Sequence, residues 1–168
     1  MSAYKKGVEY IFNRNETSKN KLTETTFSIH LSKFFNPSNN SYVDLRNPNP
    51  LGKDYIVVDY DGSIYPTDES RMLSRVGLID LKIGHIKYGL DNIILSKINI
   101  KNNNFNDADC NSCSYQLICG VDNVDKISRY GTIEVPIHDT FFCKNHMAIF
   151  DFVSEKIKTK NLAVIRNL

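Results

Sequence analysis

Residues 110–120 read Cys-Asn-Ser-Cys-Ser-Tyr-Gln-Leu-Ile-Cys-Gly, and they contain three of the four cysteines in the chain. The fourth, Cys143, gives the full spacing C-x2-C-x5-C-x23-C. The C-x2-C pair, Cys110 and Cys113, places two thiolates within reach of one metal, and Cys119 can supply a third ligand without a long loop. Four thiolates satisfy either a tetrahedral zinc ion or an iron–sulfur cluster, so we predict that these four cysteines are metal ligands.

The spacing by itself leaves the kind of metal open. Zinc sites commonly use two C-x2-C pairs, and the second pair is missing here, which favours an iron–sulfur cluster. Free or incidentally paired cysteines are the alternative to a metal site. His146 lies close to Cys143 and is a candidate ligand or hydrogen-bonding neighbour of a ligand. A histidine at a helix start or on the surface is the commoner explanation of such a residue.

Composition narrows the classes of function. The chain has 168 residues, of which 41% are hydrophobic, enough to bury one core. Its 21 Lys and Arg residues nearly balance 19 Asp and Glu residues, which argues against a nucleic-acid-binding protein. We see neither an apolar run of about 18 residues nor a secretory signal, and we therefore expect a cytoplasmic protein that does not enter a membrane. In a reducing cytosol, clustered cysteines indicate metal or redox chemistry rather than disulfides.

The pattern of apolar residues predicts an α+β fold, in which a small β-hairpin packs with several helices and the cysteines lie in loops before the C-terminal helix. The hairpin is predicted at 55–65, because a β-branched run leads into the dipeptide Asp61-Gly62, a two-residue turn signal. Thr23 is the expected N-cap of the second helix, and Thr67 or Asp68 that of the third. Between that helix and the next, a short apolar piece is expected at 83–86. The predicted helices cover 4–12, 27–35, 68–72, 90–98 and 145–158.

Residues 46–52, Arg-Asn-Pro-Asn-Pro-Leu-Gly, cannot form regular structure, because two prolines and a glycine fall within seven positions. We read this stretch as a linker or a shaped loop. It predicts a boundary between a helical lead-in at 1–46 and a second domain at 47–168, which carries all four cysteines.

The order of the motifs indicates a family. Residues 61–69 read Asp-Gly-Ser-Ile-Tyr-Pro-Thr-Asp-Glu, residues 84–86 read Gly-His-Ile, and the clustered cysteines and a late cysteine before a helix follow. In this order the motifs resemble the SPASM domain, the auxiliary-cluster domain at the C-terminus of radical SAM enzymes that modify peptides and proteins. The resemblance covers roughly 42–158. Residues 42–46 and 65–72 are most similar to the maturases of the His-Xaa-Ser peptide system.

The resemblance implies one cluster where the family holds two. A full SPASM domain binds two 4Fe–4S clusters through seven cysteines. At the positions of the first-cluster ligands this chain has Thr67, Asn123 and a residue of the loop 47–52. The resemblance therefore implies a single 4Fe–4S cluster with complete cysteine ligation, and zinc is the alternative. The implied ligands are Cys110, Cys113, Cys119 and Cys143.

The chain lacks the C-x3-C-x2-C motif with which radical SAM enzymes bind the cluster that cleaves S-adenosylmethionine. It is also too short for the barrel that holds that motif, which needs about 200 residues. We therefore expect no independent catalysis. The expected role is electron transfer or structural support of substrate binding, beside a radical SAM catalytic domain in the same or another chain and a peptide or protein substrate. A four-cysteine, zinc-stabilised interaction module and a metal-free peptide-binding domain are the competing hypotheses.

Overall fold

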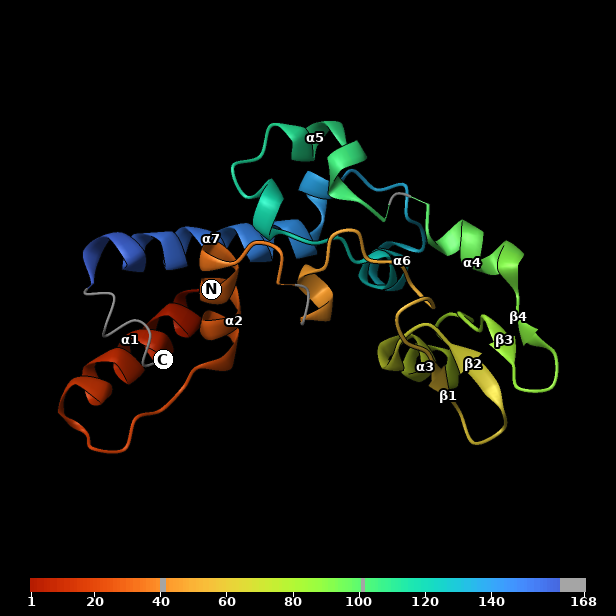
Figure 1. Cartoon of the computed structure of the whole chain (residues 1–168), viewed down its shortest axis with the longest axis horizontal. Coiled ribbons are helices and arrows are strands. Elements are labelled where there is room, and N and C mark those ends of the chain that lie inside the picture. The colour runs from red at the N-terminus through yellow and green to blue at the C-terminus, as the bar shows by residue number, and fades with distance from the viewer. Residues whose placement is uncertain (40–41, 101, 161–168) are drawn as a thin grey trace.

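The structure, a computed structural model, describes residues 1–39, 42–100 and 102–160. It confirms the predicted α+β class, with a small antiparallel sheet among helices. Figure 1 shows an arch: a helical group lies on one side, the sheet lies on the other, and the cysteine-bearing segment crosses the top between them. Residues 161–168 of the predicted second domain lie outside the described residues.

Three helices form the first group. They are α1 (Ser2–Thr17), α2 (Thr25–Phe35) and α7 (Phe141–Thr159). Their apolar stripes meet in one core, and the side chain of Lys156 on α7 forms an ion pair with Glu9 on α1. The lead-in helices thus share a core with the last helix of the chain. The buried members of this core are Val8, Phe12, Phe27, Leu31, Ile149, Phe152 and Val153.

The N-cap predicted for the second helix is wrong by one residue. Glu24, not Thr23, precedes the helix, and its carboxylate accepts hydrogen bonds from the backbone N–H groups of Thr26 and Phe27. The longer glutamate side chain can fold back over the first turn and satisfy two donors that otherwise have no partner in the helix.

The predicted hairpin is present, with β1 (Val57–Val58) paired to β2 (Ser63–Tyr65). Its turn differs from the prediction, because Gly62 donates its N–H to the carbonyl of Asp59 and three residues form the loop instead of two. Gly62 has φ +87°, the left-handed conformation that this loop type requires at its last position. The loop is therefore a three-residue connection closed by glycine.

A second hairpin follows that the sequence reading missed. The expected apolar piece at 83–86 contains β3 (Gly84–His85), which pairs with both β2 and β4 (Gly89–Leu90), so the sheet order is β1-β2-β3-β4. Leu90 is therefore in a strand, and the helix predicted from that residue begins at Asn92. Gly84 allows the close approach, because a Cβ there would lie 2.3 Å from the carbonyl oxygen of Gly89.

Two helices flank the sheet. Helix α3 (Asp68–Arg75) runs three residues beyond the predicted end and begins with a capping box, in which Thr67 and Ser70 bond reciprocally. Helix α4 (Asn92–Ile98) is capped by Asp91. Together with the sheet they enclose a second core. Its buried members are Leu51, Ile64, Leu81, Ile83, Ile98 and Val124.

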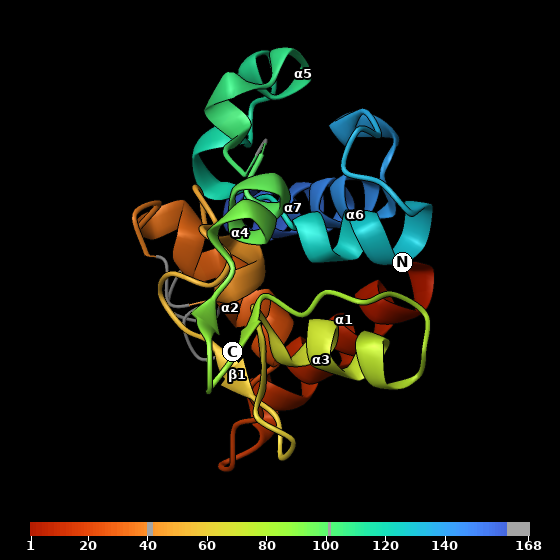
Figure 2. The same cartoon turned by 90° about the vertical axis from the view of Figure 1, so that its right-hand side faces the viewer.

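The segment at the top of the arch consists of short pieces. Helix α5 (Ala108–Asn111) and helix α6 (Asn123–Tyr130) were not predicted, and four 3-10 turns accompany them: Val43–Leu45, Asn104–Asn106, Gln116–Ile118 and Ile137–Asp139. In the turned view of Figure 2, α5 stands out at the top of the molecule, whereas α6 and α7 lie below it in the middle.

The proline-containing loop at 46–52 is a shaped loop tied to the segment at the top of the arch. Asn49 is 5% exposed, and its side chain donates to the carbonyl of Val121 at 3.1 Å. The Asn99 side chain bonds both the N–H and the carbonyl of Leu51.

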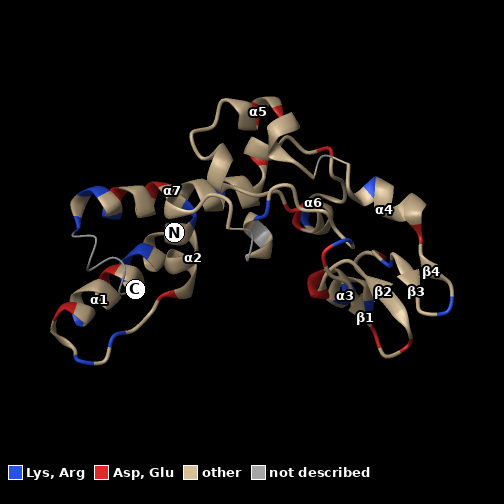
Figure 3. Cartoon of the chain, in the orientation of Figure 1, with Lys and Arg blue, Asp and Glu red and all other residues tan. Residues whose placement is uncertain are grey.

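Figure 3 shows acidic and basic residues interspersed over both sides of the arch. Among the described helices, none has the length and apolar character needed to cross a membrane.

Candidate metal centre

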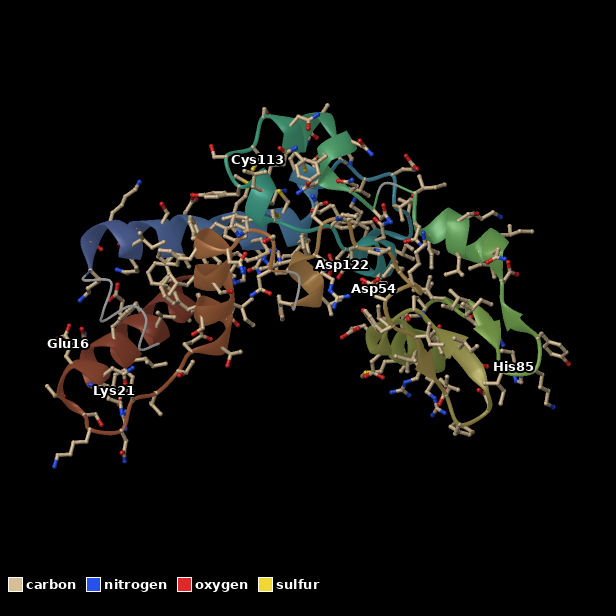
Figure 4. All side chains as sticks on the ribbon, viewed as in Figure 1. Glu16, Lys21, Asp54, His85, Cys113 and Asp122 are labelled. Atoms are coloured by element: carbon tan, nitrogen blue, oxygen red, sulfur yellow. The ribbon has the colours of Figure 1, made fainter. Side chains whose placement is uncertain are left out.

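The four cysteines, which the sequence separates by up to 33 positions, line one cavity of about 460 Å³. The cavity lies at the top of the arch, where Figure 4 labels Cys113. All four side chains are free thiols and partly buried. The remaining wall of the cavity combines apolar side chains, such as Ile137, Phe142, Met147 and Phe150, with polar and charged ones, such as Asp109, His138 and Asp151. The structure thus places the four predicted cysteine ligands on the wall of one cavity.

Local hydrogen bonds shape the first pair of cysteines. Asp107 caps α5, because its carboxylate accepts the backbone N–H of Cys110 at 3.1 Å. One turn later, the N–H of Cys113 donates to the carbonyl of Cys110 at 3.0 Å. Because the two residues sit at the start and end of one tight turn, their thiols reach the same cavity. The predicted loop is therefore a short helix at Cys110.

Cys119 is held from behind by a buried asparagine. The side-chain amide of Asn104, a residue that is 1% exposed, donates to the carbonyls of Gln116 at 2.9 Å and Cys119 at 3.2 Å. Asn104 is fixed in turn by Asn47, whose side chain bonds both its amide oxygen and its backbone N–H. This chain of amides connects the proline-containing loop to the third cysteine.

Cys143 lies inside the first turn of α7, two residues after Phe141, and not in a loop before the helix as predicted. The reason is the cap. Thr140 is 1% exposed, and its hydroxyl accepts the N–H of Cys143 at 3.1 Å and donates to the carbonyl of Ile137 at 2.6 Å. This bond starts the helix four residues earlier than the predicted Asn145.

Burial and mutual repulsion make the thiols reluctant to ionise on their own. Burial and, to a smaller extent, the neighbouring thiolates of Cys143, Cys110 and Cys113 together raise the pKa of Cys119 to about 12. Burial and the Asp107 carboxylate raise the pKa of Cys110 to about 12. Burial, with a contribution from Cys113, also raises the pKa of Cys143. Four thiolates at this place therefore require a cationic centre to offset their charge.

The donor set fits a metal centre, since four thiols without disulfide partners converge on a common cavity. In the part of the chain that the structure describes, no three or more His, Cys, Asp or Glu side chains, the four cysteines included, are arranged closely enough to hold a metal ion as they stand. The candidate ligands of the site are therefore the four cysteine sulfurs that line the cavity.

His146 does not line that cavity. It is 8% exposed, and its Nδ1 lies 2.9 Å from Nε2 of His30 on α2, with the two rings stacked. The other nitrogen of His30 contacts the carbonyl of Thr26 at 2.7 Å, which requires His30 to donate there and His146 to donate to His30. Burial lowers the pKa of His146 to about 3 and also lowers that of His30. The expectation of a histidine at a helix start or on the surface is therefore wrong: His146 lies in the second turn of α7 and is half of a buried pair between two helices.

The positions at which the resemblance places first-cluster ligands also lie near one another. Thr67, Asn49 and the neighbours of Asn123 on either side line a polar cavity of about 230 Å³. Thr67 is engaged in the cap of α3, and the Asn123 amide donates to the carbonyls of Ile98 and Ile100, both at 2.9 Å. The Asn123 amide thus joins α6 to the end of α4, whereas the bonds of Thr67 stay within the start of α3. The Asn123 side-chain oxygen is buried without a hydrogen-bond partner among the described residues.

Several residues that build the site have no signal in the sequence. Asn104, Thr140 and Tyr115 are ordinary polar residues whose partners lie on other elements or in neighbouring turns. For Thr140 alone there was a local signal, since a Ser or Thr residue just before an apolar helical stripe is a typical N-cap.

Comparisons of the chain with protein-family models, curated proteins and solved structures find no match.

Proposed function

We propose that the chain is an auxiliary iron–sulfur domain, in which Cys110, Cys113, Cys119 and Cys143 hold one 4Fe–4S cluster. The observation that carries this proposal is that all four cysteines line one cavity of about 460 Å³. That volume falls within the roughly 300–1,000 Å³ of protein sites for polyatomic ligands. The apolar side of the cavity, which includes Ile137, Phe142, Met147 and Phe150, favours a group that is partly shielded from water. When bound, such a cluster supplies one-electron transfer at a potential set by burial and by hydrogen bonds to sulfur.

The chain's own residues supply the setting for that chemistry. The backbone N–H of Tyr115 donates to Cys113 Sγ at 3.5 Å. Four cysteine ligands leave no position for a substrate to bind the metal directly, which favours electron transfer or structural support. The resemblance to SPASM domains is the further support, and it adds two partners: a radical SAM catalytic domain, in the same or another chain, and a peptide or protein substrate.

One feature of the sheet is compatible with a peptide partner. The carbonyl of Ile64 on β2 points towards β3 and accepts the N–H of Ile83 at 2.8 Å. Since backbone groups alternate along a strand, Val58, which is paired with Ile64, turns its own N–H and carbonyl to the outer edge of the sheet. Val58 is 52% exposed, and an extended peptide can add to such an edge.

Anaerobic purification of the full chain tests the proposal. We expect a brown protein with about four iron and four sulfide per chain. A variant in which all four cysteines are replaced by serine provides the control and should be colourless. One tightly bound zinc ion without sulfide would instead support the zinc-stabilised interaction module, and a metal-free, stably folded protein would support the peptide-binding alternative.

A further inference from the structure

Tyr115 attaches the cysteine loop at 113–119 to the helical group. Its hydroxyl donates to Oδ1 of Asp151 at 2.6 Å, and its ring stacks on Phe150 with centroids 5.2 Å apart and an interplanar angle of 30°. Both partners are on α7, the helix that carries the fourth cysteine. The same ring meets Phe34 of α2 edge to face at 6.3 Å. One side chain thus connects the loop with two helices.

The backbone of the same residue contacts the cysteines. The N–H of Tyr115 donates to Cys113 Sγ at 3.5 Å. Its carbonyl accepts the N–H groups of Ile118 at 3.0 Å and Cys119 at 2.9 Å. A movement of Tyr115 therefore changes the place of two of the four sulfurs and the strength of one hydrogen bond to sulfur.

We propose that Tyr115 is the positioning residue of the cysteine centre, because it fixes the loop with Cys113 and Cys119 on α7. The bond to Asp151 and the stack on Phe150 set the position of the loop relative to Cys143. The backbone hydrogen bonds of the loop cannot do this, because they join only residues within the loop. This inference depends on the proposed function only for the identity of the metal. The positioning role applies to whatever ion the four thiolates bind.

The test uses the full chain, reconstituted anaerobically with iron and sulfide. Tyr115→Phe keeps the ring and removes the bond to Asp151, and Tyr10→Phe, at a site that is 66% exposed on α1, is the matched control. We expect an unchanged iron content in both variants. Iron release to a chelator should be about 10–100-fold faster in Tyr115→Phe, the usual effect of losing a residue that orients a metal ligand. The midpoint potential of that variant should fall, because the hydrogen bond to sulfur lengthens.

A second variant removes the same bond from the other side. Asp151→Ala should accelerate iron release like Tyr115→Phe, and the double variant should add little, because both changes remove one interaction. Should Tyr115→Phe fail to fold, Asp151→Ala alone decides. Release rates and potentials equal to those of Tyr10→Phe would overturn the inference. If the wild-type chain takes up only Zn²⁺, the proposed function fails, but release of Zn²⁺ from the same variants still tests the role of Tyr115.

Discussion

Cys113 allows the simplest single-residue test of metal binding. Replacement by serine removes one of four thiolates, and a ligand that binds only the folded state stabilises it by about 2.7 kcal/mol at 100 times its Kd. In a chain of this length, the loss of that free energy lowers the Tm by about 5–10 °C. We expect this change for Cys113→Ser in calorimetry under argon. The exposed neighbour provides the control, since Ser114→Ala should leave the Tm of the metal-bound protein unchanged. Equal melting of all three proteins would favour a metal-free fold.

The buried pair of His30 and His146 makes stability depend on pH. Burial lowers the pKa of both below the value of about 6.5 that an unfolded chain has, and that of His146 to about 3. Since the unfolded chain takes up protons first on acidification, the stabilisation is complete above pH 6.5 and is lost as the pH falls from there towards 3. Each histidine contributes up to about 1.4 kcal/mol per pH unit to this loss.

Urea unfolding at pH 7.5, 6.5 and 5.5 checks this dependence. His146→Leu should flatten the decline of the unfolding free energy between pH 6.5 and 5.5. His138→Gln is the control, because Asp109 raises the pKa of the exposed His138, which acts in the opposite sense. His138→Gln should therefore not flatten the decline of the unfolding free energy between pH 6.5 and 5.5. Identical pH profiles of His146→Leu and the wild-type chain would contradict the account of the pair.

At this scale the sequence predicted which thiols share the cavity but not what holds them. The four cysteines were singled out because their spacing is typical of metal ligands. Asn104 and Tyr115 act through partners 15 and 36 positions away, and no local pattern encodes such pairs. The role of His146 was hidden for the same reason, since His30 lies 116 positions away.

Among the elements, the start of α7 determines where the fourth cysteine lies. Thr140→Ala removes the hydroxyl that accepts the N–H of Cys143 and donates to Ile137, and loss of such a cap costs about 0.5–2 kcal/mol. We expect a matching decrease in the free energy of unfolding from urea titrations, together with faster metal release. Thr140→Ser retains the hydroxyl and should keep metal release near the wild-type rate. Equal release rates in the alanine and serine variants would separate the cap from the metal centre.

Long amphipathic elements were predictable, and short ones were not. The apolar stripes of α1, α2 and α7 repeat over several turns and identified these helices, although side-chain caps moved the starts of α2 and α7. Strands β3 and β4 have two residues each, too few to show an alternation. Their existence depends on Gly84, where the missing side chain lets two backbones approach. Such tertiary contacts decide short elements, and a single sequence does not display them.

For the whole molecule, the helical lead-in and the C-terminal helix form one core. We expect that a chain shortened to 47–168 loses the cover of Ile149, Phe152 and Val153 on α7. Exposure of that apolar face should cause self-association in size-exclusion chromatography and binding of a hydrophobic dye. The shortened chain with Phe152→Glu gives the matched control, because a charge on the face should reduce the association. A monomeric shortened chain that binds no dye would show that α7 is stable without the lead-in.

Anomalous X-ray scattering from crystals grown without oxygen tests the central claim most directly, because it identifies the metal and its ligands at once. Data collected on both sides of the iron and the zinc absorption edges locate each element separately. The proposed function predicts iron density enclosed by the sulfurs of Cys110, Cys113, Cys119 and Cys143. A peak at the zinc edge alone, or crystals of the full chain with no metal between these four sulfurs, would contradict it.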